Sequence, residues 1–565
     1  MDSIIEFITD YGVFALRVAA ALLTVLTVVK CFYSMRIQKR GKKPLISLHN
    51  TITDETVPVY YWENSLGRSR GSDIYIADST VSRDHAVLLR RNEGWFISDT
   101  GSKAGVFVNN KRCQGRTQIF LNDVITLGAT QFEVKKGESS HQSVSEKDTA
   151  PHKKAMRPFV LLLLMLFSLL MFFTQAAFAS DGFMPEAFVV YGAFSAVVIS
   201  VFAFTRGFLK RASFELETLG LLFSGMGVSL LIRQNLRQAY VQLICVVLGV
   251  ILFLVIIRLL EYPDKLLKMR MYAMGAAVVL LAINLVFGTV RSGAQNWIQI
   301  GSITVQPSEL VKVIFIFVSA ATLDVLQTNR NLTEFIVFSA ICIGALFIMS
   351  DFGTALIFFA TFLIISIIRS GDYKTVILAL VAAFFGAMII LCFKPYIAQR
   401  FAAWGNVWQN YDDAAYQQAR VLTYSASGGL FGVGVGNGFL KYIFASESDL
   451  VFGLLCEESG LIVAVTVALS LAALVFYTRE ITTLSRSSFY SISACCAAGL
   501  LIIQASLNVF GATDILPLTG VTLPFISLGG SSMISCWGLL AFIKAADERT
   551  YKKLSRKHIV QVAES

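Results

Sequence analysis

The sequence predicts a polytopic α-helical membrane protein that carries a small all-β domain near its N-terminus. Of its 565 residues, 55% are hydrophobic and only 15% are charged, whereas a soluble protein carries about 25% charged residues. The apolar residues are gathered in runs of about 18 to 25, the length that spans a bilayer. One polar stretch, residues 44–136, interrupts this pattern with short segments typical of strands. These three observations predict the fold class.

Residues 1–43 predict a transmembrane anchor and not a cleaved signal peptide. Asp2, Glu6 and Asp10 precede the apolar run, and basic residues between Lys30 and Lys43 follow it. This is the reverse of the charge order in a signal peptide. The positive-inside rule places the basic flank in the cytoplasm.

Residues 44–136 are expected to form a small β-sandwich, because charge rises here and the apolar runs shorten. A stretch rich in Ser, His and Lys follows and predicts a flexible linker over residues 137–157. The expected strands are 59–62, 73–77, 85–90, 95–98 and 131–135.

Twelve further apolar runs bring the expected number of spans to about thirteen. Two extra spans (158–206) precede a ten-span core (207–545), and a basic tail (546–565) follows. Alternation places the basic loops, the tail and the β domain together on the cytoplasmic side. The runs are 158–178, 185–206, 214–232, 238–260, 272–290, 309–327, 333–350, 352–370, 373–393, 451–476, 487–511 and 520–545.

Composition also excludes several function classes. The net charge of +10 suits the positive-inside pattern, and no basic groove with interleaved aromatic residues indicates nucleic-acid binding. The nine cysteines include no Cys-x-x-Cys pair, so neither a zinc site nor a disulfide framework is indicated. None of the five histidines lies in the main membrane region, which argues against histidine-based catalysis there.

The β segment resembles a forkhead-associated (FHA) domain, a sandwich that binds phosphothreonine. Arginine offers a fixed fork of donors to phosphate oxygens, and serine adds a hydroxyl donor. The resemblance implies that Arg68 and Ser82 bind the phosphate, that Arg83 or Lys103 assists, and that Asn109 belongs to the same peptide site. The motifs that carry it are Gly67-Arg68-Ser69, Ser82-Arg83-Asp84-His85-Ala86, Asp99-Thr100-Gly101-Ser102, Gly105 and Val108-Asn109-Asn110.

By the same resemblance, His85 supports the recognition loop without touching the ligand. One departure concerns Lys103-Ala104-Gly105, where the family usually has Thr-Asn before the glycine and uses that Asn to hold the peptide backbone. Two interpretations therefore stay open, a phosphopeptide-binding domain and a sandwich that serves as a structural spacer.

The segment from Gln417 to Gly460 combines many glycines with carboxylates at the mouth of an apolar helix. Glycine permits close backbone approach, and a carboxylate at that position is a functional candidate by default. Together with motifs before and after it, this segment resembles the SEDS family, the polytopic proteins of bacterial shape, elongation, division and sporulation. The ordered motifs are Asn296-Trp297-Ile298, Gly301, Gln306-Pro307-Ser308-Glu309-Leu310, Lys312, Asp351-Phe352-Gly353-Thr354-Ala355, Gln417, Gly428, Asp449, Glu457-Glu458-Ser459-Gly460, Gln504, Asn508, Pro517, Thr519-Gly520, Leu523-Pro524-Phe525 and Ser527-Leu528-Gly529-Gly530-Ser531-Ser532.

The resemblance implies a peptidoglycan glycosyltransferase that polymerises lipid II, an undecaprenyl-diphosphate-linked disaccharide-peptide, at the outer face of the bacterial cytoplasmic membrane. Asp449 is the expected general base. Lys312, Arg400 and a divalent cation (Mg or Mn) are expected to stabilise the diphosphate. The expected substrate-binding residues are Trp297, Glu309, Lys312, Asp351, Arg400, Gln417, Ser527 and Gly529.

Plainer structural roles are weighed beside these. Trp297 has the character of an interfacial aromatic residue, and Glu309 and Lys312, one helical turn apart, can neutralise each other. Glu457 and Glu458 lie about two turns inside a helix, so a packing or polar-network role is favoured for them.

Departures from the family leave alternatives open. Ile443-Phe444-Ala445-Ser446-Glu447-Ser448 replaces a Leu-Pro-Glu-x-His-Thr run before Asp449, so the loop that orients the base has changed. Three functions are carried: a glycosyltransferase regulated through its FHA domain, a non-catalytic scaffold that recruits phosphorylated proteins, and a lipid II flippase. The expected partners are a class B penicillin-binding transpeptidase and a phosphothreonine protein, and no nucleic acid.

Overall fold

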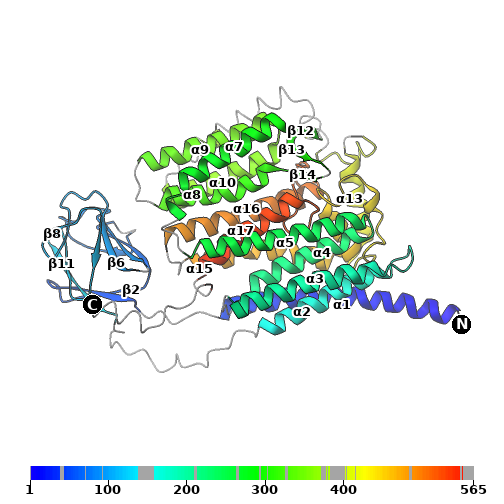
Figure 1. The fold of residues 1–565 in the computed structure, drawn as a ribbon, viewed down its shortest axis with the longest axis horizontal. Helices are drawn as coiled ribbons and strands as arrows, with labels where there is room; N and C mark the ends of the chain where they lie inside the picture. Colours follow the sequence, from blue (N-terminus) through cyan, green and yellow to red (C-terminus); the bar gives the residue numbers. More distant parts are fainter. Residues whose placement is uncertain are drawn as a thin grey trace.

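The computed structural model describes residues 2–37, 44–69, 72–91, 93–137, 158–208, 213–261, 266–291, 294–301, 303–324, 329–370, 377, 379–381, 401, 404–413, 415–482, 487–547 and 550. Arg400 and most of the span predicted at 373–393 lie outside these residues. The all-β domain lies beyond one end of a helical bundle (Figure 1). That end is called the near end. The opposite end, called the far end, carries the strands β12 (Thr289–Arg291), β13 (Ala294–Ile300) and β14 (Ile303–Val305) and the helix α13 (Tyr416–Ser427).

The β domain is a sandwich of two sheets. One has six strands in the order β2-β1-β11-β10-β7-β8, and the other has five in the order β4-β3-β5-β6-β9. Among the described residues, the strands of both sheets pair antiparallel, except that β3 and β4 run parallel. The bounds are β1 Ile46–Asn50, β2 Thr56–Val59, β3 Glu63–Gly67, β4 Ile74–Tyr75, β5 Ala86–Arg91, β6 Gly94–Asp99, β7 Val106–Val108, β8 Lys111–Arg112, β9 Arg116–Ile119, β10 Val124–Leu127 and β11 Thr130–Lys136.

Most of the strands expected from sequence are present, but one is wrong in position. Residues 60–62 connect two strands, β2 and β3, instead of belonging to one. The domain has its own hydrophobic cluster, in which Leu48, Leu66 and Leu88 are fully buried. A separate core is the mark of a unit that can fold alone.

The bundle is built mainly of long helices. Eight of the described helices are long and apolar enough to cross a membrane, as a multi-pass membrane protein requires. The bounds are α1 Asp2–Ile37, α2 Pro158–Ala177, α3 Glu186–Ala203, α4 Glu215–Ile232, α5 Leu236–Leu259, α7 Arg270–Phe287, α8 Pro307–Asp324, α9 Asn329–Ile348, α10 Phe352–Ser370, α13 Tyr416–Ser427, α14 Val451–Ser459, α15 Leu461–Thr482, α16 Ser488–Ala512 and α17 Gly530–Ala546.

Each predicted span outside 373–393 coincides with a described helix, with two differences. The run 451–476 is broken into α14 and α15 at Gly460, which has a φ of +88°. The run 520–545 begins with ten non-helical residues, and α17 starts only at Gly530. Pro524, and Phe525 with a φ of +65°, keep this segment out of the helix.

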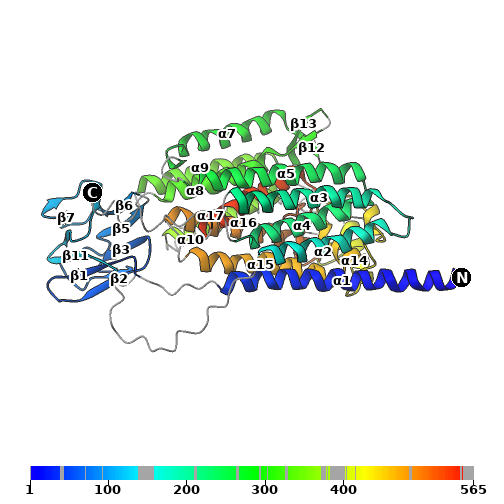
Figure 2. The same cartoon turned by 60° about the horizontal axis from the view of Figure 1, so that its bottom comes forward.

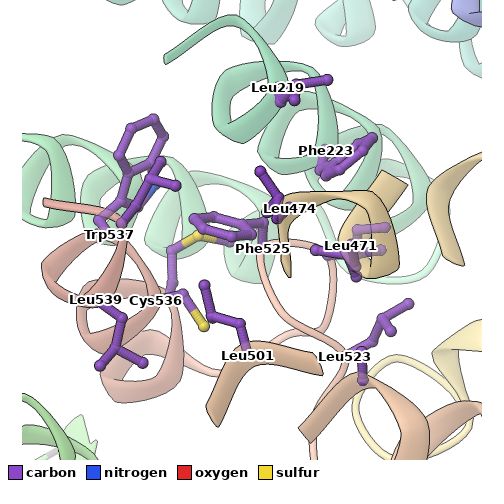
Figure 3. Close-up of a cluster of buried hydrophobic side chains, with 14 of the residues drawn as sticks. Leu219, Phe223, Leu471, Leu474, Leu501, Leu523, Phe525, Cys536, Trp537 and Leu539 are labelled. Carbon is purple, nitrogen blue, oxygen red and sulfur yellow. The ribbon is translucent and has the colours of Figure 1, made fainter. Parts of the chain in front are cut away.

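The centre of the bundle is packed around Trp537 of α17 (Figure 3). Its ring lies edge-on to Phe253 of α5, with centroids 5.6 Å apart, and to Phe525, at 5.7 Å. A Cβ atom on Gly220 or Gly249 would come within 2.9 or 2.7 Å of the indole, so only glycine leaves room for it. Phe525 thereby fixes the 517–529 segment to the core.

The N-terminal helix runs along the bundle (Figure 2) and packs against α2, α4 and α15. Thr24 of α1 and Ser168 of α2 share a buried hydroxyl–hydroxyl hydrogen bond of 3.0 Å. Ser34, nearer the β domain, donates to the carboxylate of Glu215 in α4 at 2.8 Å. These buried polar contacts give α1 a defined register against the core.

The β domain touches the bundle through Glu63 at the start of β3. One carboxylate oxygen of Glu63 accepts from the backbone N–H of Ser488 at 2.8 Å and from its hydroxyl group. The other accepts from Arg91 at 2.8 Å. Glu63 therefore caps the N-terminus of α16, where unpaired N–H groups favour an anion.

Candidate functional site

Asp449 lies at the far end, on the turn that leads into α14. The turn is closed by Ala445, whose carbonyl oxygen accepts from the N–H groups of Asp449 at 3.0 Å and of Leu450 at 3.1 Å. Ala445 itself has a φ of +62°, a conformation that costs energy for a residue other than glycine. The Asp449 side chain is half-buried.

Side chains from distant segments hold the backbone of this loop. Gln417 of α13 donates to the carbonyl oxygen of Phe444 at 2.9 Å. Asn508 of α16 donates to the carbonyl oxygen of Asp449 at 2.9 Å, and Ser527 donates to that of Ser448 at 2.6 Å. All three contacts are made to backbone carbonyl oxygens, so they hold the turn from which the Asp449 side chain extends.

Ser527 also holds the 517–529 segment together and joins it to α5. Its hydroxyl oxygen accepts from the N–H of Leu523 at 2.8 Å, and its carbonyl oxygen accepts from Gln242 at 3.0 Å. The Gln242 side chain in turn accepts from the N–H of Gly529 at 3.4 Å. Ser527 and Gly529, both predicted to bind substrate, are thus used to join the 517–529 segment to the Asp449 loop and to α5.

Glu447 shares the loop with Asp449 and is also half-buried. Its carboxylate accepts from Ser446 at 3.2 Å, and its carbonyl oxygen accepts from the N–H of Leu528 at 2.7 Å. A Cβ atom on Gly520 would come 3.4 Å from an Asp449 carboxylate oxygen. Gly520 has a φ of +72°, so a larger residue there would be strained and would close on the carboxylate.

Glu309 and Lys312 form a buried ion pair in α8, with 2.7 Å between Oε1 and Nζ. Lys312 also donates to Gln504 of α16 at 3.1 Å, and Ser535 of α17 donates to Glu309 at 2.8 Å. The two side chains are 6% and 1% exposed. In this structure the pair links α8, α16 and α17. Its role in substrate binding stays a prediction.

Asp351 joins the start of α10 to the β12–β14 hairpins. One carboxylate oxygen accepts from the N–H of Thr354 at 3.1 Å, as a helix cap does. The other accepts from Asn296 at 2.8 Å and Gln306 at 3.2 Å. Trp297 follows Asn296 in β13 (Ala294–Ile300), paired with β12 (Thr289–Arg291), and the third strand is β14 (Ile303–Val305).

Residues 428–441, here called the Gly-rich loop, are held by two carboxylates that follow Asp449 in α14. Glu457 accepts from the N–H groups of Phe439 at 2.7 Å and Leu440 at 2.9 Å. Glu458 accepts from the N–H of Gly436 at 2.9 Å. These contacts agree with the packing and polar-network role favoured from the sequence.

Cation binding has no further support in the described part of the chain. Among those residues, no group of three or more His, Cys, Asp or Glu side chains is placed to hold a metal ion. Arg400 lies outside them. The divalent cation therefore stays a prediction.

Most of the residues predicted to bind a phosphopeptide lie at the end of the sandwich opposite Glu63. Arg68 is exposed just after β3, and its N–H donates to the carbonyl oxygen of Ser82 at 3.0 Å. The Ser82 hydroxyl oxygen accepts from the N–H of Lys103 at 3.1 Å. Arg83 and Lys103 are exposed beside them, so four of the five predicted residues come from adjoining loops.

His85 is fully buried beneath these loops. Its Nδ1 atom accepts from the N–H of Ser82 at 3.0 Å, and Nε2 lies 3.1 Å from the carbonyl oxygen of Gly105. This geometry matches the supporting role expected for it. Asn109 is instead paired with Asp123 at 2.8 Å and with the N–H of Val124 at 2.9 Å, and its contact with a peptide stays a prediction.

Asp78 fixes the loop that presents Ser82. Its carboxylate accepts from the N–H and hydroxyl groups of Thr80 and from the hydroxyl group of Thr130, each at 2.8 Å. The hydrogen bond from the Thr80 N–H, followed by those from Thr130 and the Thr80 hydroxyl, lowers the pKa of Asp78 below its ordinary value.

Sequence reasoning assigned no role to several residues that shape the site. Asn296, Gln306, Gln504 and Asn508 were recognised only as motif members, and Gln242 was not singled out. The available signal was the presence of amide side chains at the ends of apolar runs, where hydrogen-bonding groups need partners.

The fold and the far-end site define a multi-pass membrane protein with an appended β-sandwich. The FtsW/RodA/SpoVE family, described as cell cycle proteins, matches residues 214–552, and the FHA domain family matches residues 64–128. The first match spans more than half of the chain, so the protein belongs to the FtsW/RodA/SpoVE family, with an FHA domain near its N-terminus.

Named relatives support the assignment. The peptidoglycan glycosyltransferase RodA of Mycobacterium leprae is 26% identical over 348 residues, covering 57% of this chain and 75% of the relative. The probable peptidoglycan glycosyltransferase FtsW of Coxiella burnetii is 31% identical over 293 residues, covering 49% and 78%. Stage V sporulation protein E of Bacillus subtilis is 28% identical over 257 residues, covering 44% and 69%.

A solved structure supports the fold. A chain of a peptidoglycan synthase complex, at 23% identity and a TM-score of 0.50, covers 60% of this chain, which covers 98% of it.

Proposed function

We propose that this protein is a peptidoglycan glycosyltransferase that polymerises lipid II, with Asp449 as the general base. The observation that carries the proposal is the convergence of Gln417, Asn508 and Ser527 on the backbone of the Asp449 loop. Three segments far apart in sequence hold one carboxylate-bearing turn, which is the preorganisation that a catalytic base needs. The named glycosyltransferase relatives support the same reaction class.

In the proposed reaction, the Asp449 carboxylate takes the proton from a hydroxyl group of the acceptor sugar. The hydroxyl oxygen then forms a bond to the anomeric carbon of the donor, and the bond between that carbon and the diphosphate oxygen breaks. The lipid diphosphate leaves with the electron pair. Because its charge must be stabilised, the proposal includes a divalent cation and Arg400 as candidates for that role.

The proposal places the far end outside the cell and the FHA domain with the C-terminus in the cytoplasm. Arg36, Arg258 and Arg479 lie in the last turns of α1, α5 and α15, and Arg270 begins α7, all at the near end. The positive-inside rule counts such basic residues, and they support a cytoplasmic near end. Covalent labelling tests it: an exposed Tyr442→Cys should react in intact cells, and Asn110→Cys should react only after lysis.

Purified protein supplied with lipid II, alone and with a class B penicillin-binding transpeptidase, tests the reaction. We expect wild type to form glycan strands, and Asp449→Asn to lose roughly 10²- to 10⁴-fold in rate at unchanged membrane abundance. Glu447→Ala is the matched control in the same loop and should lose only modestly. Normal polymerisation by Asp449→Asn would show that the base is assigned to the wrong residue. Inactivity of all three proteins would favour the non-catalytic scaffold.

The FHA domain is proposed to bind a phosphothreonine protein and so to regulate synthesis. The clustering of Arg68, Ser82 and Lys103 supports this. Arg68→Ala should abolish binding of a phosphothreonine-peptide library, because each charge-assisted hydrogen bond contributes roughly 1.5 to 3 kcal/mol. If the wild-type protein binds no such peptide, the spacer interpretation holds.

A further inference from the structure

The N-terminal helices reach the Gly-rich loop at the far end. Arg17 of α1 donates to the carbonyl oxygen of Gly432 at 3.2 Å. One turn earlier on α1, Phe14 lies edge-on to Phe431, with ring centroids 6.1 Å apart. A helix outside the family match at 214–552 therefore contacts a loop inside it.

The connection between α2 and α3 contacts the same loop independently. The N–H of Ser180 donates to the side-chain oxygen of Asn437 at 2.8 Å. Lys441 donates to Asp181 at 3.1 Å and to the carbonyl oxygen of Gly436 at 2.6 Å. One face of the Gly-rich loop is thus covered by residues that precede the ten-span core.

The other face of the loop lies directly on α14. The N–H groups of Val433 and Gly434 donate to the carbonyl oxygens of Glu457 at 2.9 Å and Glu458 at 3.0 Å. A Cβ atom on Gly432 would come within 2.2 Å of the Glu458 carbonyl oxygen, so the two backbones touch without space for a side chain. A displacement of the loop must therefore move α14 or break these hydrogen bonds.

Asp449 lies two residues before α14 begins. Leu440, at the end of the Gly-rich loop, is fully buried, and its side chain lies 3.2 Å from where a Cβ atom of Gly453 would be. The loop, the first turn of α14 and the Asp449 turn are thus one packed unit.

We infer that Arg17 is a positioning residue for the reaction at Asp449: by holding Gly432, it fixes the Gly-rich loop and, through Glu457 and Glu458, the helix that follows the base. This inference rests on the proposed function, because it takes Asp449 as the reacting group. It also gives α1 a role beyond membrane anchoring. Because α1 ends at Ile37 and β1 of the FHA domain begins at Ile46, the helix that contacts the Gly-rich loop is also the one that precedes the FHA domain in the chain.

The test compares Arg17→Ala and Arg17→Lys with wild type in the purified full-length protein. We expect Arg17→Ala to lower kcat for lipid II polymerisation by about tenfold or more with KM within about twofold, since a small misplacement of the base slows the chemical step without touching substrate. Arg17→Lys keeps one charged donor and should recover part of the rate. Leu22→Ala is the control and should match wild type, because Leu22 lies on the same helix and is 61% exposed.

A second readout separates this inference from the proposed function. Arg17→Ala should raise hydrogen exchange at the amides of Val433, Gly434 and Gly436, whatever reaction the protein performs. Unchanged exchange, or raised exchange with an unchanged kcat, would overturn the positioning role. If wild type makes no glycan while exchange rises in Arg17→Ala but not in Leu22→Ala, the loop-holding contact stands and the proposed reaction falls.

Discussion

Asn508 joins two segments that form the site: its side-chain amide donates to the carbonyl oxygen of Asp449 at 2.9 Å and to that of Val521 at 2.7 Å. Asn508 is itself 1% exposed, on a helix that runs the length of the bundle. Together with the contacts of Ser527 and Leu528, this buried amide group holds the candidate base next to the 517–529 segment.

Replacing Asn508 with Leu should slow the reaction while Asp449 remains present. Leucine has a similar volume but donates no hydrogen bond, so both carbonyl oxygens lose a buried partner. We expect kcat for lipid II polymerisation to fall about 10- to 100-fold, because misplacement of a reacting group is costly. Ser493→Ala, a buried change near the other end of the same helix, is the control. Equal rates for Asn508→Leu and wild type would show that the loop is held without this contact.

The buried pair of Glu309 and Lys312 predicts a stability effect. Lys312→Met leaves Glu309 as an uncompensated buried charge, which costs about 3–5 kcal/mol. The double variant Lys312→Met/Glu309→Gln should recover much of that loss. Thermal unfolding of the detergent-solubilised variants measures both. A substrate-binding role predicts another pattern, in which Lys312→Met raises KM while the unfolding temperature stays that of wild type.

These two cases illustrate what could be read from the sequence. The apolar runs gave the helices because bilayer length and hydropathy are local properties, and Asp449 was found because it stands among motif residues in order. The pairing of Lys312 with Glu309 was readable from their spacing, but the contacts of Lys312 with Gln504 and of Asn508 with Asp449 could not be found in this way. They depend on which helices pack together, as with Gln504 and Ser535 around the buried pair.

The β domain shows the same division. Its recognition residues are a prediction from sequence motifs, but β3 was missed, because Glu63–Gly67 has only one large apolar residue, Leu66, to mark it. The pairing of β3 with β5 compensates for this weak local signal. The contact between Glu63 and Ser488 joins residues 425 positions apart, and no local pattern encodes it.

Asp78 predicts an acid-dependent loss of stability in the β domain. Its pKa is lower in the folded domain than in the unfolded chain, so the unfolded state takes up the proton more readily. The stabilisation by Asp78 is fully present above the pKa of Asp in the unfolded chain, about 3.9. It is lost as pH falls through the lower pKa that Asp78 has in the folded domain. Urea unfolding of the 44–137 domain between about pH 6 and pH 2.5 measures it.

Asp78→Asn should flatten that part of the pH dependence, since an amide does not titrate. It should also weaken phosphothreonine-peptide binding, because the loop that carries Ser82 loses charge-assisted hydrogen bonds. Glu93→Gln, at an exposed carboxylate on the turn between β5 and β6, at the opposite end of β5 from the recognition loops, is the control. An identical pH dependence in wild type and Asp78→Asn would contradict the assignment.

Glu63 predicts that docking of the β domain and peptide binding can be separated. Glu63→Ala removes the cap from α16 and the partner of Arg91, and loss of a helix cap costs about 1 kcal/mol. Hydrogen exchange at the amides of Ser488 and its neighbours should therefore rise about fivefold, since 1.4 kcal/mol corresponds to a factor of ten.

Affinity of the β domain for a phosphothreonine peptide should stay within about twofold in Glu63→Ala. Arg68 and Ser82 lie at the other end of the sandwich, and salt screens the interaction between exposed charges that are far apart. Glu133→Ala, which removes a half-buried partner of Lys135, should change neither quantity. If Glu63→Ala abolishes peptide binding, the two ends of the domain are coupled, and the docked and ligand-binding states are not independent. If exchange at Ser488 is unaltered, the Glu63 carboxylate does not cap the helix in the membrane-embedded protein, and the link between the β domain and α16 must lie in other contacts.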